Sequence, residues 1–128
     1  MTASERTHVV RASERRHETS QTPGMAREEA VRTTSMWAGI ATTDGHTSSG
    51  WHHHGAYESV IFVLEGTVRL EFGPGGRETL EAGAGDTLYV APGEVHREGN
   101  PADQRSLIFV VRGGEGELVV NEGGPASG

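Results

Sequence analysis

Short segments with strand-like patterns follow one another along most of the chain. Some alternate apolar and polar positions, as Thr67–Phe72 does, and others are compact apolar runs such as Val60–Leu64. Glycine-rich turns separate most of them. The strand candidates are Val31–Ala41, Trp51–His54, Glu58–Glu65, Thr67–Phe72, Arg77–Glu81, Thr87–Val90, Val95–Glu98, Ser106–Arg112 and Glu117–Val120. Strands that recur about every 8 to 12 residues, with no helical period between them, predict an all-β sandwich or barrel.

The same pattern divides the chain into three parts. A length of 128 residues fits one domain with its own core. Residues 1–30 carry five arginines, five acidic residues and few large apolar side chains, which predicts a polar, partly flexible N-terminal arm. Residues 31–120 hold the strand candidates and are the predicted barrel. Residues 121–128 are predicted to be a flexible tail.

Composition excludes several function classes. Eighteen acidic residues against eleven basic ones, all of them arginine, give a net charge of −7, which repels the phosphate backbone of nucleic acids. The chain has no cysteine, so disulfides, thiolate zinc sites and thiol nucleophiles are excluded. The longest apolar run, Val60–Leu64, falls far short of the roughly 20 residues of a membrane span. We therefore expect a cytoplasmic protein that binds neither nucleic acid nor a membrane.

Candidate chemistry centres on the histidines at 52–54 and on His96. Alternate side chains of a strand share a face, so His52 and His54 are expected to point the same way. Two imidazoles on one face can bind one cation, and imidazole suits zinc, copper, iron and nickel. His96, from another strand, is the natural third ligand. The alternative interpretation is that these histidines are solvated polar residues of loops and turns.

The spacing of these residues resembles the two motifs of the cupin superfamily. The second motif, G-x5-P-x-G-x2-H-x3-N, is matched by Gly85, Gly93, His96 and Asn100, with Ala91 in place of the first proline. The first motif, G-x5-H-x-H followed by a glutamate and a glycine, is matched by His52, His54 and Gly66, whereas Gly45 lies one residue too far upstream. The two motifs and the strands beside them extend the resemblance over about residues 31–120.

This resemblance implies a double-stranded β-helix, or jelly roll, with a divalent metal ion in the barrel mouth. The implied ligands are His52, His54, His96 and a glutamate. The family spacing places Ser59 where the glutamate is expected. A one-residue bulge would instead turn Glu58 inward, and we favour Glu58 as the fourth ligand. If Glu58 is not a ligand, it is the candidate general base.

Five large apolar residues are candidates for lining a small-molecule pocket at the barrel mouth. They are Trp37 or Met36, whichever faces inward, together with Phe62, Tyr89 and Phe109. The alternative is that they form plain barrel core. Trp51 and Tyr57 flank the histidine strand, and Arg69 is expected to face away from its apolar neighbours.

The resemblance implies a metal-dependent enzyme that acts on a small organic molecule, and we expect a dioxygenase-like oxidation with iron, nickel or manganese. One alternative is a non-redox zinc cyclase or isomerase, of the kind that acts on polyketides. Another is a module that binds a small ligand without turnover. The resemblance also implies a homodimer, for which the strand at 31–41 is the candidate contact.

Overall fold

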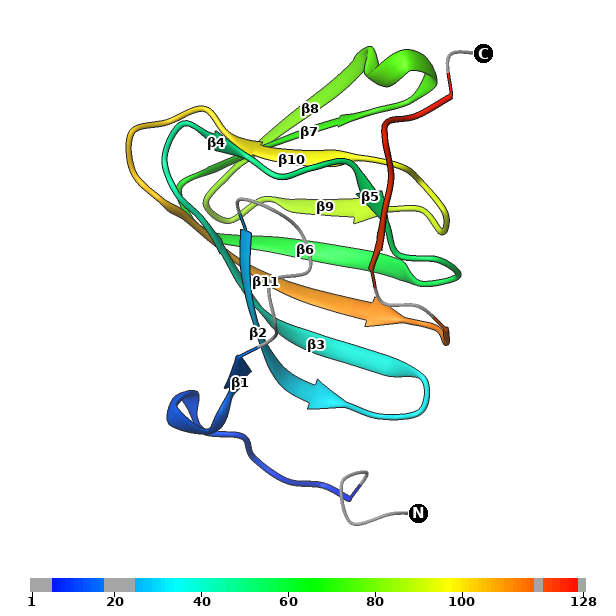
Figure 1. The fold of residues 1–128 in the computed structure, drawn as a ribbon. Coiled ribbons are helices and arrows are strands. Elements are labelled where there is room, and N and C mark those ends of the chain that lie inside the picture. The colour runs from blue at the N-terminus through cyan, green and yellow to red at the C-terminus, as the bar shows by residue number, and fades with distance from the viewer. Residues whose placement is uncertain (1–5, 18–24, 117–118, 127–128) are drawn as a thin grey trace.

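A computed structural model of the chain describes residues 6–17, 25–116 and 119–126. It shows two antiparallel sheets that form the layers of a barrel, and a two-stranded ribbon beside them (Figure 1). The six-stranded sheet contains, in spatial order, β1 (Arg16–His17), β2 (Met25–Arg32), β3 (Met36–Thr43), β11 (Ser106–Gly113), β6 (Glu58–Glu65) and β9 (Thr87–Val90). The predicted all-β jelly-roll class is confirmed.

The second layer is a four-stranded sheet, and short elements complete the fold. Its strands, in spatial order, are β4 (Thr47–Ser48), β10 (Arg97–Asn100), β7 (Thr67–Phe72) and β8 (Glu78–Gly83). The ribbon pairs β5 (His52–His53) with β12 (Val120–Asn121), and two 3-10 turns lie at η2 (Ala12–Glu14) and η3 (Pro74–Gly76). Among the described residues, no helix is long and apolar enough to cross a membrane.

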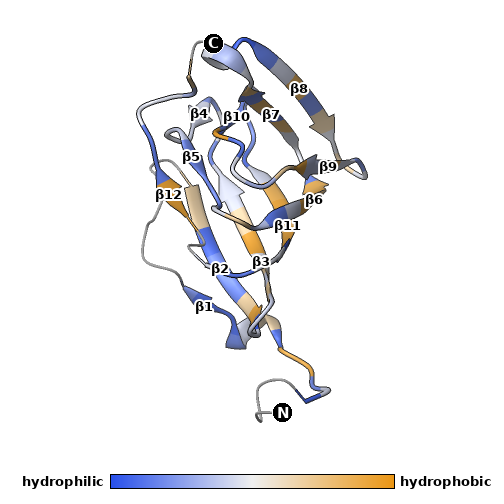
Figure 2. Cartoon of the chain, turned by 90° about the vertical axis from the view of Figure 1, so that its right-hand side faces the viewer, coloured by the Kyte–Doolittle hydropathy of each residue, from blue (hydrophilic) through white to orange (hydrophobic). Residues whose placement is uncertain are grey.

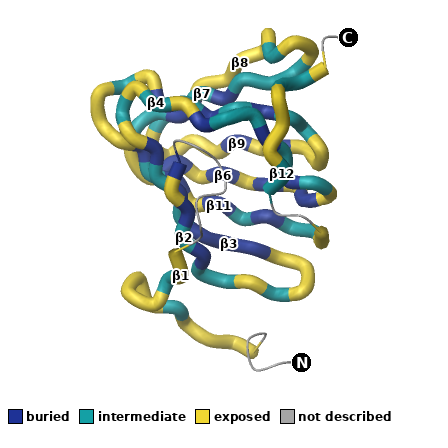
Figure 3. The backbone as a smooth tube through the Cα atoms, viewed as in Figure 1, coloured by how far each residue is buried: buried dark blue, intermediate teal, exposed yellow. Residues whose placement is uncertain are grey.

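The core lies between the two layers, where alternate residues of each strand point inward. On β6, for example, Ser59, Ile61 and Val63 are buried and the residues between them are exposed (Figure 3). The apolar core is formed by Met25, Trp37, Ala41, Ile61, Val63, Val68, Leu70, Ala82, Leu88, Val90, Ile108 and Val110. These residues come from both sheets, so their burial holds the two layers together.

The six-stranded sheet begins before residue 31, where the barrel was expected to start. Within the region predicted as an arm, β2 covers Met25–Arg32, and residues 1–5 and 18–24 lie outside the described residues. The inward face of β2 carries Arg27 and Glu29, which are charged, and this hid the strand from the hydropathy pattern. The predicted strand at 31–41 is a hairpin instead, in which Thr33 donates its backbone N–H to Met36. Because β3 lies between β2 and β11, it has no open edge for pairing with a second copy.

The segment around β12 runs along β5, which carries His52 of the first motif and His53. Val120 and Asn121 pair with His53 and His52, and Glu122 donates its backbone N–H to the Trp51 carbonyl at 2.9 Å. The strand predicted over 117–120 and the tail predicted over 121–128 fall partly on residues 117–118 and 127–128, which lie outside the described residues. The described part of the tail is thus held at its start beside β5 and at Ala126, whose carbonyl accepts from the Gly75 N–H at 2.8 Å.

The outward face of the six-stranded sheet also carries exposed apolar side chains, and hydrophobic residues recur along the strands of this sheet (Figure 2). Phe62 pairs with Phe109 across β6 and β11, and Val60 pairs with Tyr89 across β6 and β9. Phe62 is 40% exposed and Tyr89 57% exposed. The exposed residues of this face, named here the outer apolar face, are Met36, Val60, Phe62, Leu64, Tyr89 and Phe109.

The position of this face corrects the predicted substrate pocket. Met36, Phe62, Tyr89 and Phe109 lie outside the barrel, and of the five candidates only Trp37 is buried inside it. The reason is strand parity. Phe62 shares a face of β6 with Glu58, and the structure turns that face outward and the Ser59 face inward.

Candidate metal centre

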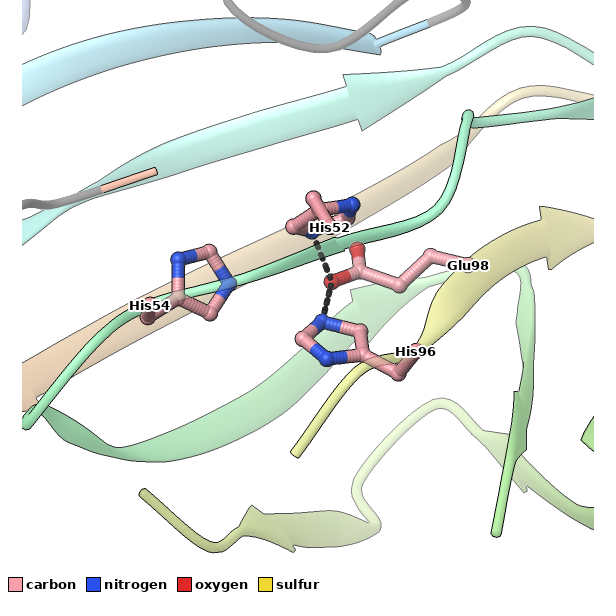
Figure 4. A group of neighbouring side chains, drawn as sticks. All are labelled: His52, His54, His96 and Glu98. Atoms are coloured by element: carbon pink, nitrogen blue, oxygen red, sulfur yellow. Dashed lines mark hydrogen bonds and ion pairs between the residues drawn. The ribbon is translucent and has the colours of Figure 1, made fainter. Parts of the chain in front are cut away.

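Four buried side chains converge inside the barrel: His52, His54, His96 and Glu98 (Figure 4). Each offers one ligand atom, and these atoms all lie within 4.8 Å of one another. The centroid of the His52 ring is 4.9 Å from that of His54 and 4.4 Å from that of His96. The structure thus brings together the three histidines that the motifs predicted, and adds a carboxylate that was not among the candidates.

Backbone pairing positions two of the histidines. His52 and His96 form an isolated antiparallel bridge, in which each donates its N–H to the other's carbonyl at 2.9 Å. This bridge fixes their rings on the same side. Gly93, with φ of +70°, turns the chain before His96 and donates its N–H to the carbonyl of Gly55 at 2.8 Å. That contact joins the turn of the second motif to the residue after His54 in the first motif.

Hydrogen bonds to the backbone define which ring nitrogens face the cluster. Nδ1 of His52 donates to the Gly50 carbonyl at 3.0 Å, and Nδ1 of His96 donates to the Glu94 carbonyl at 2.8 Å. A carbonyl only accepts, so Nδ1 carries the proton and Nε2 of each neutral ring presents a lone pair. Such an outer hydrogen bond is the usual way in which a metal-ligating histidine is oriented.

The two lone pairs point toward a carboxylate rather than a donor. Oε1 of Glu98 lies 3.3 Å from Nε2 of His96 and 3.8 Å from Nε2 of His52. Nε2 of His52 and Oε2 of Glu98 are buried, and neither has a hydrogen-bond partner among the residues that the structure describes. Lone pairs that face one another in a buried site repel unless a cation lies between them. The donor set of three imidazoles and one carboxylate therefore fits a divalent metal ion.

Burial lowers the pKa of His52 to about 4, although the negative charge of Glu98 opposes this shift. Burial by itself raises the pKa of Glu98. The close contact with the His96 ring and the positive charge of Arg27 outweigh this effect and hold the pKa of Glu98 below its usual range. At neutral pH the imidazole of His52 is thus neutral and Glu98 is ionised, which are the protonation states that metal ligands require.

A buried arginine accompanies the cluster. Arg27 lies on the inward face of β2, and its charge acts on both His52 and Glu98 to lower their pKa values. The cross-strand partner of Arg27 on β3 is Ala41. Sequence analysis missed Arg27 because it assigned residues 1–30 to an arm.

The position of Glu58 corrects the predicted fourth ligand and general base. Glu58 is exposed on the outward face of β6, where its carboxylate accepts a hydrogen bond from the Tyr89 hydroxyl at 3.0 Å. Ser59 points inward at the family's glutamate spacing and is 2% exposed. The carboxylate of the cluster comes instead from Glu98, which lies on the same face as His96 because the two are two residues apart. That spacing was a signal visible in the sequence.

Three other residues named in the sequence analysis make contacts that stabilise the fold and are not part of the cluster. The side-chain amide of Asn100 donates to the carbonyls of Thr43 and Gln104 and accepts from the Ala102 N–H, so this motif residue holds a turn. The ring of Trp51 lies 4.5 Å from the guanidinium of Arg97. The Arg69 side chain is 43% exposed and pairs with Glu81 at 3.4 Å.

A protein-family model described as "Cupin domain" matches residues 39–112, more than half of the chain. The chain belongs to the cupin family. A search of curated protein sequences found no match. The match covers β3 to β11, and so includes all four residues of the cluster in this cupin.

Solved structures similar to this cupin confirm the fold. The polyketide cyclase RemF from Streptomyces resistomycificus superposes with a TM-score of 0.73 at 21% identity, over 91% of this chain and 85% of that one. KdgF from Halomonas sp. gives a TM-score of 0.69 at 16% identity, over 85% and 96%. Oxalate decarboxylase from Bacillus subtilis gives a TM-score of 0.69 at 18% identity, over 81% of this chain and 29% of that one.

Proposed function

We propose that this cupin is a divalent-metal-dependent enzyme that acts on a small organic molecule, with a dioxygenase-like oxidation as its reaction. The observation that carries the proposal is the convergence of two Nε2 lone pairs on the buried carboxylate of Glu98. In a purely structural core, buried polar groups are normally hydrogen-bonded to one another, so two acceptor nitrogens facing a carboxylate would not be expected there. A cation bound between these acceptor atoms would remove their mutual repulsion.

The number of ligands favours a six-coordinate metal. Catalytic zinc sites keep three protein ligands and one open position, and four protein ligands complete a tetrahedron. His52, His54, His96 and Glu98 supply four ligand atoms. In a six-coordinate site of iron, manganese or nickel, four protein ligands leave two positions open, enough for a substrate and dioxygen. Such a metal supplies Lewis acidity and, for iron, redox chemistry with dioxygen.

The residues of the chain orient and shield this site. The carbonyls of Gly50 and Glu94 hold the rings of His52 and His96 in one tautomer. The N–H of Glu98 donates to the Ser49 hydroxyl at 2.9 Å, which anchors the backbone that carries the carboxylate. All four side chains of the cluster are buried, and the surrounding apolar core excludes water. A rigid, dry site strengthens electrostatic interactions with whatever it binds.

A non-redox reaction is the second candidate, and the similarity to RemF favours it. RemF is a polyketide cyclase, and its structure superposes over most of this chain. With zinc, the same residues would polarise a carbonyl for a cyclisation or isomerisation rather than activate dioxygen. The metal that the protein carries therefore separates the two reactions, and the absence of any metal affinity would leave a module that only binds a ligand.

Elemental analysis of the protein purified without added metal tests the proposal. We expect iron, manganese or nickel at about one ion per chain, and loss of that ion in His96→Ala. For iron-loaded protein, nitric oxide serves as a probe for an open position, and we expect the electron paramagnetic resonance signal of an iron–nitrosyl complex. Zinc at one ion per chain would favour the cyclase or isomerase, and no affinity for any of the four metals would overturn an enzymatic metal centre.

A further inference from the structure

We propose that the outward face of the four-stranded sheet carries a second binding site, a groove over Gly99 that takes a neutral polyhydroxylated ring such as a single sugar unit. The groove has a volume of about 230 Å³. It lies on the side of β10 that faces away from the metal cluster, because Glu98 and Asn100 of this strand are buried inside the barrel. The proposal does not depend on the proposed function. The lining of the groove includes Gly99, Ser48, Arg69, Glu71, His46 and Pro101.

Strand register places a gap among the side chains of this face. Gly99 of β10 is paired on one side with Ser48 of β4 and on the other with Arg69 of β7. The row continues from Arg69 to Glu81 of β8. These four strands are neighbours in the sheet (Figure 1). Because adjacent strands lie about 4.8 Å apart, the backbones of Ser48 and Arg69 are about 10 Å apart, and the residue between them has no side chain.

The fold itself does not require a glycine at position 99. Gly99 does not have a positive φ, and β10 pairs with β4 and β7 without a shift in register. The three atoms nearest to a Cβ added there would lie 3.5 to 3.9 Å away, the first of them Oγ of Ser48, which is ordinary contact. Glycine weakens the interior of a strand, and it often marks a bulge or the close approach of another backbone or a ligand. With regular pairing and no close backbone, we infer that a ligand approaches Gly99.

The groove offers hydrogen-bond donors and acceptors side by side. Among the residues that the structure describes, the guanidinium of Arg69 donates only to Glu81, at 3.4 Å, which leaves most of its five N–H groups for a ligand. Glu71 is two residues along β7 on the same face, and accepts from Arg97 at Oε2, so that Oε1 is open to a donor. Across the gap, Ser48 adds a hydroxyl. The hydroxyl groups of a sugar both donate and accept, so they match this mixture.

The charges around the groove favour a neutral ligand over an ion. Arg69 and Arg97 are each paired with a glutamate, so these two pairs carry no net charge. At the edge of the groove, His46 and Asp103 pair with each other and add no net positive charge. An anion therefore finds no excess of positive charge, and a cation would meet the guanidinium of Arg69. The volume lies below the roughly 300 to 1,000 Å³ of pockets for drug-sized molecules, which fits one small ring.

Nuclear magnetic resonance titration of the full-length, ¹⁵N-labelled protein tests the groove. The probes are D-glucose, D-galactose and D-mannose, and inorganic phosphate is the anionic comparison. We expect at least one hexose to shift the backbone amide signal of Gly99 with a dissociation constant of about 1 to 10 mM, and phosphate to shift it much less. Gly99→Val fills the gap and is expected to weaken hexose binding at least about 10-fold. Arg69→Gln removes the donors and is expected to weaken it about threefold to tenfold.

The stability of Gly99→Val separates a role in binding from a role in folding. Valine is favoured in strands, so the urea midpoint of this variant should be at least that of the wild type, although hexose binding is lost. The matched control is Gly113→Val on β11, in the other sheet. A Cβ added at Gly113 would have no atom within 4 Å, and hexose binding should be unchanged. If circular dichroism shows that Gly99→Val is unfolded, Gly99→Ala decides, and its methyl group is expected to weaken binding about threefold or more.

Several results would overturn the proposal. If none of the three hexoses shifts the Gly99 signal, the groove is only a depression of the surface. A shift with phosphate as large as that with the hexoses would indicate an anion site instead. Hexose shifts confined to amides of the barrel interior, or hexose binding that the Gly99 variants retain, would place the sugar elsewhere. Each of these results leaves the metal centre standing, because the groove and the cluster lie on opposite sides of β10.

Discussion

Oε1 of Glu98 lies 3.3 Å from Nε2 of His96, a ring whose other nitrogen already donates to the backbone carbonyl of Glu94. In a neutral ring held in this way, Nε2 has no proton to give to the carboxylate. The contact is therefore a pair of ligand atoms rather than an ordinary hydrogen bond. The negative charge of Glu98 should therefore determine how tightly the cluster binds a metal ion.

Replacing that carboxylate should weaken metal binding. Glu98→Gln keeps the size of the side chain but removes the negative charge, and we expect the affinity for manganese or iron to fall about 10-fold to 100-fold. Competition with a coloured chelator measures the change. The matched control is Glu58→Gln, on the outward face of β6, which should leave the affinity unchanged. A larger loss in Glu58→Gln than in Glu98→Gln would restore Glu58 as the ligand.

The stability of the metal-free protein should fall on acidification. Burial lowers the pKa of His52 from 6.5 to about 4, so between these values the unfolded chain binds more protons than the folded chain. The free energy of unfolding therefore rises with pH in this window, by up to about 3 kcal/mol. The pKa of Glu98 is also lowered, so the free energy of unfolding should fall further below about pH 4.5, where the unfolded chain again binds more protons than the folded chain.

Urea titrations of the metal-free protein between pH 7 and pH 4 measure this dependence. His52→Gln removes the titrating ring, so its unfolding free energy should change much less between pH 6.5 and pH 4 than that of the wild type. Equal pH slopes in the two proteins would show that burial of His52 is not the cause.

Asn100 should be important for stability rather than for metal binding. Its buried amide makes three hydrogen bonds to the backbone, and Asn100→Ala leaves those backbone groups without their partner. We expect a loss of about 3 kcal/mol in the free energy of unfolding, measured with urea. Gln104→Ala is the matched control, because Asn100 uses only the backbone carbonyl of Gln104. Equal losses in the two variants would contradict this role for Asn100.

The outer apolar face should pair two copies of the chain. Its six large apolar residues are between 38% and 57% exposed, and a contiguous exposed apolar patch of this kind marks an interaction surface. We propose a homodimer through this face, and expect sedimentation to show a dimer at tens of micromolar. Phe62→Glu should give a monomer, whereas Val9→Glu, on an exposed residue outside the sheets, should not. A monomeric wild type would contradict the proposal.

Motif spacing and strand alternation predicted the jelly roll and the meeting of His52, His54 and His96. They could not predict which face of β6 points inward, because apolar residues occupy both faces of this strand. Hydropathy alone therefore cannot decide which side chains of β6 face inward, and both Glu58 and Phe62 were placed on the wrong side.

The charged interior was hidden for a different reason. Arg27 and Glu29 occupy inward positions of β2, where a hydropathy pattern requires apolar residues. The burial of Glu29 depends on a partner on the next strand, because the indole N–H of Trp37 donates to its carboxylate at 3.0 Å, and only the folded hairpin brings the two together. Glu98 was more accessible to prediction, since its parity with His96 follows from the predicted strand at 95–98.

The position of β11 has a consequence for folding. This strand lies between β3 and β6, and pairs with both along most of its length. In a folding intermediate in which β11 is not yet paired, β3 and β6 each have an unpaired edge and an apolar outward face. This combination favours association between chains. Because the pairing of β11 with β3 closes a long loop, formation of the sheet is expected to be slow, on the order of milliseconds to seconds. The most aggregation-prone species of this protein should therefore be an intermediate in which β3 and β6 have formed and Ser106–Gly113 has not yet docked.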